Sequence, residues 1–145
     1  MRIAMAVLVV SMLGSSCLSG ACTAIGCLNS VTFTLTSTMQ QAFVVNEGVT
    51  VKVCVGTDCQ TGVLTNTANG GSSSSTNPEL SLNPGTGEVV RTFTNRLSGA
   101  QDVSIELTKN GNVVGADMRS GVTFTDFTPN GPACPPVCQS AKVSL

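Results

Sequence analysis

The sequence predicts an all-β protein, an immunoglobulin-like antiparallel β-sandwich of about seven to nine short strands stapled by disulfides. Apolar residues recur at every second position from Ser30 onward, and polar turn sequences separate these runs. No stretch of this region shows apolar residues at helical spacing. A chain of 145 residues has room for one such domain. The absence of Trp and Tyr limits the prediction to the architecture, because true immunoglobulin domains carry both residues at fixed places.

The alternating runs predict the strands in chain order. In each run one set of residues faces a core and the other faces water, as in antiparallel sheets covered on one side. β-branched residues dominate every run. A last strand is expected over residues 140–145. The inward sets are Val31, Phe33 and Leu35; Val49, Val51, Val53 and Val55; Val103, Ile105 and Leu107; and Val122 with Phe124.

Turn sequences fit the same fold. Asn110-Gly111 lies between two runs and is the preferred centre of a two-residue type I′ hairpin. Residues 83–87 form a second turn. Residues 66–78, with the run Gly70-Gly71 and four serines, are expected to form a flexible loop, because small polar residues have nothing to bury.

Composition excludes several functions. Charged residues make up only 10% of the chain, which favours an extracytoplasmic β-protein covered by Ser, Thr, Asn and Gly. The net charge is −1 and the basic residues are scattered, which argues against nucleic acid as a partner. The chain has no His, the usual general acid–base residue, and no Trp or Tyr for stacking bases.

Residues 1–21 are predicted to be a signal peptide and N-terminal tether, with the sandwich over residues 22–145. Arg2 precedes an apolar run that ends near Leu13, and this run is too short to span a bilayer. The segment Leu13-Gly14-Ser15-Ser16-Cys17 resembles the lipobox of bacterial lipoproteins, although the family prefers Leu one position closer to the cysteine. The segment before Cys22 resembles it in the same way and also fits simple cleavage after Ala21.

Cysteine parity favours lipid on Cys17. Removing Cys17 from the seven cysteines leaves six that can all pair, whereas lipid on Cys22 leaves one free thiol in an oxidising compartment. The alternatives are lipid on Cys22 and cleavage after Ala21. The six structural cysteines are then Cys22, Cys27, Cys54, Cys59, Cys134 and Cys138.

The cysteine spacing predicts one local and two terminal disulfides. Cys54 and Cys59 bracket four residues read as a hairpin loop, and residues that bracket such a loop face each other. The other four cysteines precede the first and last strands, which commonly run side by side in parallel in such sandwiches. Cys22 then pairs with Cys27, Cys134 or Cys138. A four-cysteine zinc site at the termini is the alternative, and redox catalysis is not expected without C-x-x-C.

Three segments resemble a group of uncharacterised bacterial putative lipoproteins. These segments are Cys22-Thr23-Ala24-Ile25-Gly26-Cys27-Leu28-Asn29-Ser30-Val31, Val53-Cys54-Val55-Gly56-Thr57-Asp58-Cys59, and Pro129-Asn130-Gly131-Pro132-Ala133-Cys134-Pro135-Pro136-Val137-Cys138. Together they span the predicted domain. The resemblance implies a location in the cell envelope and six structural cysteines. It implies no activity.

The sequence favours a tethered module over an enzyme. Without His, only a Ser–Lys pair using Lys52, Lys109 or Lys142 remains for nucleophilic catalysis, and no motif surrounds these lysines. No cofactor or metal is expected. We expect a structural or binding role at the envelope, with another envelope protein or a polysaccharide as partner. The alternative is a secreted or periplasmic inhibitor of an extracellular enzyme, which a flexible loop at residues 66–78 disfavours.

Overall fold

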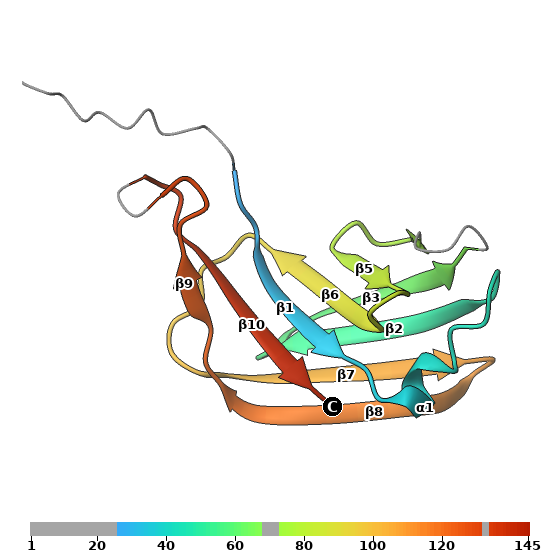
Figure 1. The fold of residues 1–145 in the computed structure, drawn as a ribbon. Coiled ribbons are helices and arrows are strands. Elements are labelled where there is room, and N and C mark those ends of the chain that lie inside the picture. Colours follow the sequence, from blue (N-terminus) through green and yellow to red (C-terminus); the bar gives the residue numbers. More distant parts are fainter. Residues whose placement is uncertain (1–25, 68–72, 132–133) are drawn as a thin grey trace, which may run out of the picture.

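Two five-stranded sheets pack face to face in the computed structural model, which describes residues 26–67, 73–131 and 134–145. One sheet has the order β5-β6-β1-β10-β9 and is called sheet A; the other has the order β4-β3-β2-β7-β8 and is called sheet B (Figure 1). The strands are β1 (Asn29–Thr34), β2 (Gly48–Val55), β3 (Asp58–Asn66), β4 (Ser73–Ser75), β5 (Leu80–Asn83), β6 (Glu88–Phe93), β7 (Gln101–Lys109), β8 (Asn112–Val122), β9 (Thr125–Phe127) and β10 (Cys138–Ser144).

The core lies between the two sheets and is built by the alternating residues. Strand β2 shows the pattern, because its valines are buried while Thr50 and Lys52 are exposed. Phe93 and Phe124 add an edge-to-face ring contact with centroids 5.9 Å apart. The predicted inward residues that are buried are Val31, Phe33, Leu35, Val49, Val51, Val53, Val55, Val103, Ile105, Leu107 and Phe124. The all-β sandwich prediction is therefore confirmed.

The strand order is immunoglobulin-like. In one sheet the β2–β3 and β7–β8 hairpins are joined by the pairing of β2 with β7, and β5-β6-β1 begin the other. Strand β10 lies beside β1 and runs parallel to it, with Ser30 opposite Ser140 and Phe33 opposite Val143. The expected parallel neighbourhood of the first and last strands is confirmed, so sheet A is not wholly antiparallel.

The strand count differs from the prediction, because the described residues contain ten strands instead of seven to nine. Ser73–Ser75, expected to lie in a flexible loop, form edge strand β4 against β3, and the Ser73 hydroxyl donates to the carbonyl of Leu82 at 2.5 Å. Backbone pairing and this hydroxyl hold β4 without any apolar side chain. Strand β8 ends at Val122 and β9 begins at Thr125, so Val122 and Phe124 do not share one strand.

Two short features join the strands at one end of the sandwich. The helix α1 (Ser37–Gln40) is capped by Thr36, whose hydroxyl accepts from the backbone N–H of Met39 at 3.2 Å. The β7–β8 connection is the two-residue turn Asn110-Gly111, and both residues have positive φ, as a type I′ turn requires. The hairpin prediction is confirmed.

Candidate functional site: the disulfide-tied end

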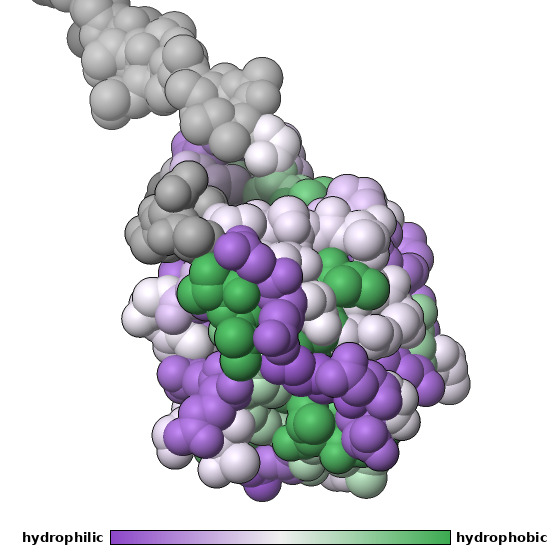
Figure 2. Space-filling view, turned by 90° about the vertical axis from the view of Figure 1, so that its right-hand side faces the viewer, coloured by the Kyte–Doolittle hydropathy of each residue, from purple (hydrophilic) through white to green (hydrophobic). Residues whose placement is uncertain are grey.

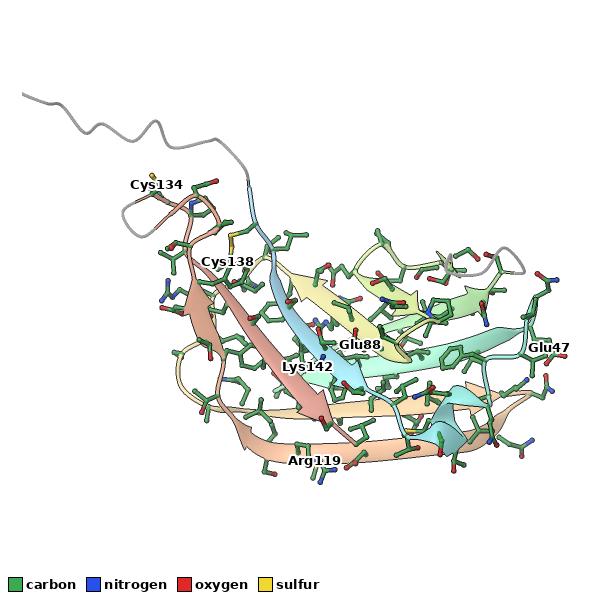
Figure 3. The ribbon with its side chains drawn as sticks, in the orientation of Figure 1. Glu47, Glu88, Arg119, Cys134, Cys138 and Lys142 are labelled. Atoms are coloured by element: carbon green, nitrogen blue, oxygen red, sulfur yellow. A yellow bond between two sulfur atoms is a disulfide. The ribbon has the colours of Figure 1, made fainter. Side chains whose placement is uncertain are left out.

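A disulfide joins the two segments that begin β1 and β10. Cys27 is bonded to Cys138 across a sequence separation of 111 residues, with Cα atoms 6.1 Å apart. The parallel pairing of β1 and β10 brings the starts of both strands to the same end of the molecule, which we call the disulfide-tied end (Figure 3). The sequence left open whether the terminal disulfides are local or cross the chain, and this bond crosses it.

Two buried amides organise this end. Asn29 donates through Nδ2 to the carbonyls of Thr94 and Asn95 at 3.3 and 2.9 Å, and its Oδ1 accepts from the backbone N–H of Gln139 at 2.8 Å. Gln139 accepts from the N–H of Leu97 at 2.8 Å and donates to the carbonyl of Leu97 at 3.3 Å. In each buried amide both the oxygen and the NH₂ group are hydrogen-bonded. These bonds fix the β6–β7 connection to the β1–β10 pair.

The candidate lipidation sites, Cys17 and Cys22, lie outside the described residues. Cys134 is disulfide-bonded as well. Because Cys27 pairs with Cys138, two of the alternatives left open by the sequence are excluded, namely Cys22–Cys27 and Cys22–Cys138. The same bond removes two of the four thiols of the alternative zinc site. Among the described residues no group of three or more His, Cys, Asp or Glu could hold a metal ion.

The local disulfide Cys54–Cys59 is also confirmed, with Cα atoms 4.0 Å apart. The hairpin that it closes is tighter than the sequence indicated. Val55 pairs with Asp58, so the connection has two residues, Gly56 and Thr57, instead of four. Gly56 has φ +58°, and glycine at the first position of a two-residue turn tolerates this value without strain.

A buried arginine anchors this hairpin, and sequence reasoning missed it. Arg91 of β6 is fully buried and crosses the core to sheet B. Its NH1 donates to the carbonyls of Val53 and Asp58 at 3.2 and 2.6 Å, and its NH2 pairs with the Asp58 carboxylate. The alternation Val89, Arg91, Phe93 places Arg91 on the inward face and is the signal that could have found it.

The lysines weighed for a Ser–Lys site lie apart. Lys109 pairs with Glu47 at 2.6 Å and also donates to the carbonyl of Ala42, while Lys142 pairs with Glu88 at 2.6 Å. The Lys142 ammonium, helped by the Thr86 hydroxyl, holds the pKa of Glu88 below its ordinary value. Lys52 shares a hollow with a serine, a space of about 320 Å³ on the outer face of sheet B that Ser104 and Glu106 also line.

Exposed apolar side chains gather at both ends of the sandwich. Leu28, Phe127 and Val137 lie at the disulfide-tied end, beside Cys27 and Cys138. At the opposite end, which we call the far end, the exposed residues are Val44 and Val45 after α1 and Val113 and Val114 after the Asn110-Gly111 turn. The Lys109–Glu47 ion pair and the Lys109–Ala42 hydrogen bond join these two far-end segments.

Comparisons with models of known protein families, with curated proteins and with solved structures find no match. In the described part of the chain no helix is long and apolar enough to cross a membrane. The disulfides themselves carry information about location, because such bonds form and persist in oxidising compartments. They indicate an extracytoplasmic location.

Proposed function

We propose that this protein is an exported, lipid-anchored module of the cell envelope that has a binding or structural role and no catalytic activity. The observation that carries the proposal is the state of the cysteines. All five that the structure describes are disulfide-bonded: Cys27, Cys54, Cys59, Cys134 and Cys138. The resemblance of three segments to bacterial putative lipoproteins supports the same function.

The pairing of the described cysteines supports lipid on Cys17. Four of them pair with one another, and Cys134 is disulfide-bonded as well. We propose Cys22 as the partner of Cys134. Cys22 lies five residues before Cys27, and Cys134 lies four before Cys138. Because these two spacings are similar, a Cys22–Cys134 bond would lie next to the Cys27–Cys138 bond. Cys17 is then the cysteine that carries the lipid.

The arrangement of the lysines supports a non-catalytic role. A lysine that acts as a general base must lie within hydrogen-bond reach of the nucleophile's hydroxyl. Lys109 and Lys142 each pair with a carboxylate. Lys52 and Ser104 line one hollow, yet no hydrogen bond joins these two described side chains. We expect the purified protein to show no saturable hydrolase turnover; turnover abolished by Lys52→Ala would contradict the proposal.

The far end is the surface that we propose for a protein or polysaccharide partner. Loops carry binding residues more often than the strands that support them. Val44, Val45 and Val113 are about half exposed there, beside the ion pair of Lys109 and Glu47. A mixture of apolar and charged groups is typical of non-obligate interfaces. An anchor at the disulfide-tied end leaves this surface pointing away from the membrane.

The edge of strand β8 beyond Val113 and Val114 is a poorer binding surface. An exposed edge can accept a partner strand, and proteins prevent this with inward-pointing charges and irregular pairing. The side chains of Asp117 and Arg119 pair with each other at 2.9 Å, and Asp117 also accepts from the backbone N–H of Met118 at 2.7 Å. The β7–β8 pairing shifts register twice. These features favour the far-end loops as the binding surface.

The inhibitor alternative requires a rigid, disulfide-braced loop. Flexibility of the loop at residues 66–78 was the argument against an inhibitor, and that argument is weaker because Ser73–Ser75 form a strand. The turn closed by Cys54 and Cys59, however, offers only Gly56 and Thr57 at its tip. Two residues are too few to fill an extended substrate cleft, so the module remains the better proposal.

Labelled palmitate tests the anchor. Incorporation in cells should disappear in Cys17→Ser and persist in Cys22→Ser. Loss of label in Cys22→Ser alone moves the anchor to Cys22, and no label in the wild-type protein refutes the lipid anchor.

Capture of envelope components by the detergent-solubilised protein tests the binding surface. The double change Val44→Asp with Val113→Asp should abolish a capture that Met118→Asp preserves. Met118 is the matched control because it is exposed at 66% but lies on the β8 edge. Equal capture by both variants would exclude the far end.

A further inference from the structure

We propose that the disulfide-tied end rests on the surface of the membrane that holds the lipid, through an apolar cap formed by Leu28, Phe127 and Val137. This inference depends on the proposed lipid anchor and adds an orientation to it. The exposed fractions of the three residues are 52%, 40% and 41%. The partner is the bilayer interface, where membrane affinity grows with the apolar area that is buried.

The three cap residues surround one disulfide. Leu28 follows Cys27 and Val137 precedes Cys138, and the bond between these cysteines brings the two segments together. Phe127 of β9 lies directly opposite Cys138 of β10. The start of β1 and the start of β10 lie at the same end of the molecule in Figure 1. The cap is therefore one surface, held by a covalent bond and by strand pairing.

The segments that carry the cap hold a single charged residue, Asp126 of β9. The sequence contains no charged residue between Arg2 and Glu47 and none between Asp126 and Lys142. Asp126 is exposed near this end but pairs with Arg96, so the two charges neutralise each other. Desolvation of an unpaired charge is the main cost of placing a polar surface at a bilayer. This end avoids that cost.

The length of the chain before the domain keeps the cap close to the lipid. Nine residues, numbers 18–26, separate Cys17 from Cys27, and an extended chain spans at most about 3.5 Å per residue. The tether therefore reaches no more than about 35 Å. A Cys22–Cys134 bond shortens the free part to four residues, or about 17 Å between Cys17 and Cys22.

The far end does not share these properties. Figure 2 faces that end of the molecule and shows separate apolar patches divided by hydrophilic residues. Glu47 and Lys109 lie among its exposed valines. Strand β1, which follows the tether in the sequence, begins at the opposite end of the sandwich (Figure 1). Of the two apolar clusters, only the cap is adjacent to the proposed lipid.

A single introduced tryptophan tests the contact, because the chain contains no Trp and no Tyr. The probe variant is Phe127→Trp in the lipidated full chain, bound to phosphatidylethanolamine–phosphatidylglycerol vesicles with brominated acyl chains. Its emission should fall at least two-fold relative to vesicles without bromine. The matched control is Val113→Trp at the far end, exposed at 60%, whose emission should change by less than a tenth.

The possible outcomes separate the two proposals. Protein that floats with the vesicles while neither tryptophan is quenched overturns the membrane contact and leaves the lipid anchor intact. Quenching of the far-end tryptophan alone reverses the orientation and also overturns the inference. Protein that does not float refutes the anchor, and the contact that depends on it.

Hydrogen exchange of the unlabelled protein provides a second measurement in case Phe127→Trp does not fold. Amides in residues 126–131 and at Val137 should exchange at least three-fold more slowly on vesicles than in the unlipidated Cys17→Ser protein in solution. The triple variant Leu28→Ser, Phe127→Ser and Val137→Ser should lose this protection while it still floats. Equal exchange on pure lipid vesicles and in solution contradicts a bilayer contact; a protein partner would then be the occupant.

Discussion

The two ends of this sandwich are closed by different means. At the disulfide-tied end, Cys27–Cys138 and the buried amides of Asn29 and Gln139 join segments more than a hundred residues apart. At the far end, the contacts are a glycine turn, a four-residue helix and the partly exposed ion pair of Lys109 and Glu47. Covalent and buried polar contacts resist solvent and salt, whereas exposed ion pairs do not. The first end suits attachment and the second suits exchangeable contacts.

The largest expected effect comes from the terminal disulfide. In a Cys17→Ser, Cys22→Ala, Cys134→Ala background, replacing Cys27 and Cys138 by alanine should lower the free energy of unfolding by about 5 kcal/mol. Replacing Cys54 and Cys59 should lower it by only about 2 kcal/mol, because the closed loop is short. Urea unfolding measures both. Equal losses would show that the Cys27–Cys138 disulfide constrains the unfolded chain no more than the Cys54–Cys59 disulfide does.

The ion pairs of the two ends should differ next. Asp58→Asn should lower the free energy of unfolding by about 2 kcal/mol, because it leaves the buried guanidinium of Arg91 without a counter-ion. Glu47→Gln at the far end should lower it by less than about 1 kcal/mol, because the Glu47 side chain is 54% exposed. Thermal unfolding compares the two variants, and a larger loss in Glu47→Gln would reverse the contrast between the ends.

The far-end turn should show a smaller, purely backbone effect. Gly111 has φ +78° and nothing within 4 Å of an added Cβ atom, so Gly111→Ala should destabilise by about 1 kcal/mol through strain alone. Gly85→Ala is the control, because that glycine lies in a turn without positive φ. Its free energy of unfolding should stay close to that of the wild type. Similar losses in both variants would mean that turn strain is not the cause.

The smallest effect concerns Glu88 and Lys142, which lie side by side on sheet A, away from both ends (Figure 3). Lys142→Ala should raise the pKa of Glu88 toward its ordinary value of 4.5. A lowered pKa stabilises the fold above the unfolded value, and this contribution is lost as the pH falls through the lowered pKa. Carboxyl NMR titration measures the shift; an unchanged pKa would contradict the pairing.

Alternation predicted β1, β2 and β7 because each carries enough apolar residues to define a face. It did not predict the body of β8, the longest strand, because none of its residues is buried. It could not predict β4, since Ser73–Ser75 contribute no side chain to the core and are held by backbone pairing. Alternation places Arg91 on the inward face, but it could not predict the partners of its guanidinium, because those carbonyls belong to β2 and β3, more than thirty residues away. Contacts of this kind depend on how the sheets stack, which the period of a single strand does not report.

The candidate site was also predictable only in part, because some of its contacts depend on how distant segments pair. Sequence spacing gave the Cys54–Cys59 pair, and fold topology brought Cys27 near Cys138. The apolar cap combines residues from three separate segments, Leu28, Phe127 and Val137. None of these segments has a motif, so only the β1–β10–β9 pairing shows that they meet.

The Cys27–Cys138 bond also determines how the domain carries mechanical force. A pull on the N-terminus reaches β1 at Asn29 and, through the disulfide, β10 at Cys138 at the same time. Strand β1 is hydrogen-bonded on both sides, to β6 and to β10, and β10 is also bonded to β9. When the far end is held, these hydrogen bonds are loaded together in shear and do not open one at a time like a zipper. Single-molecule extension should therefore show a lower rupture force after reduction of the disulfides.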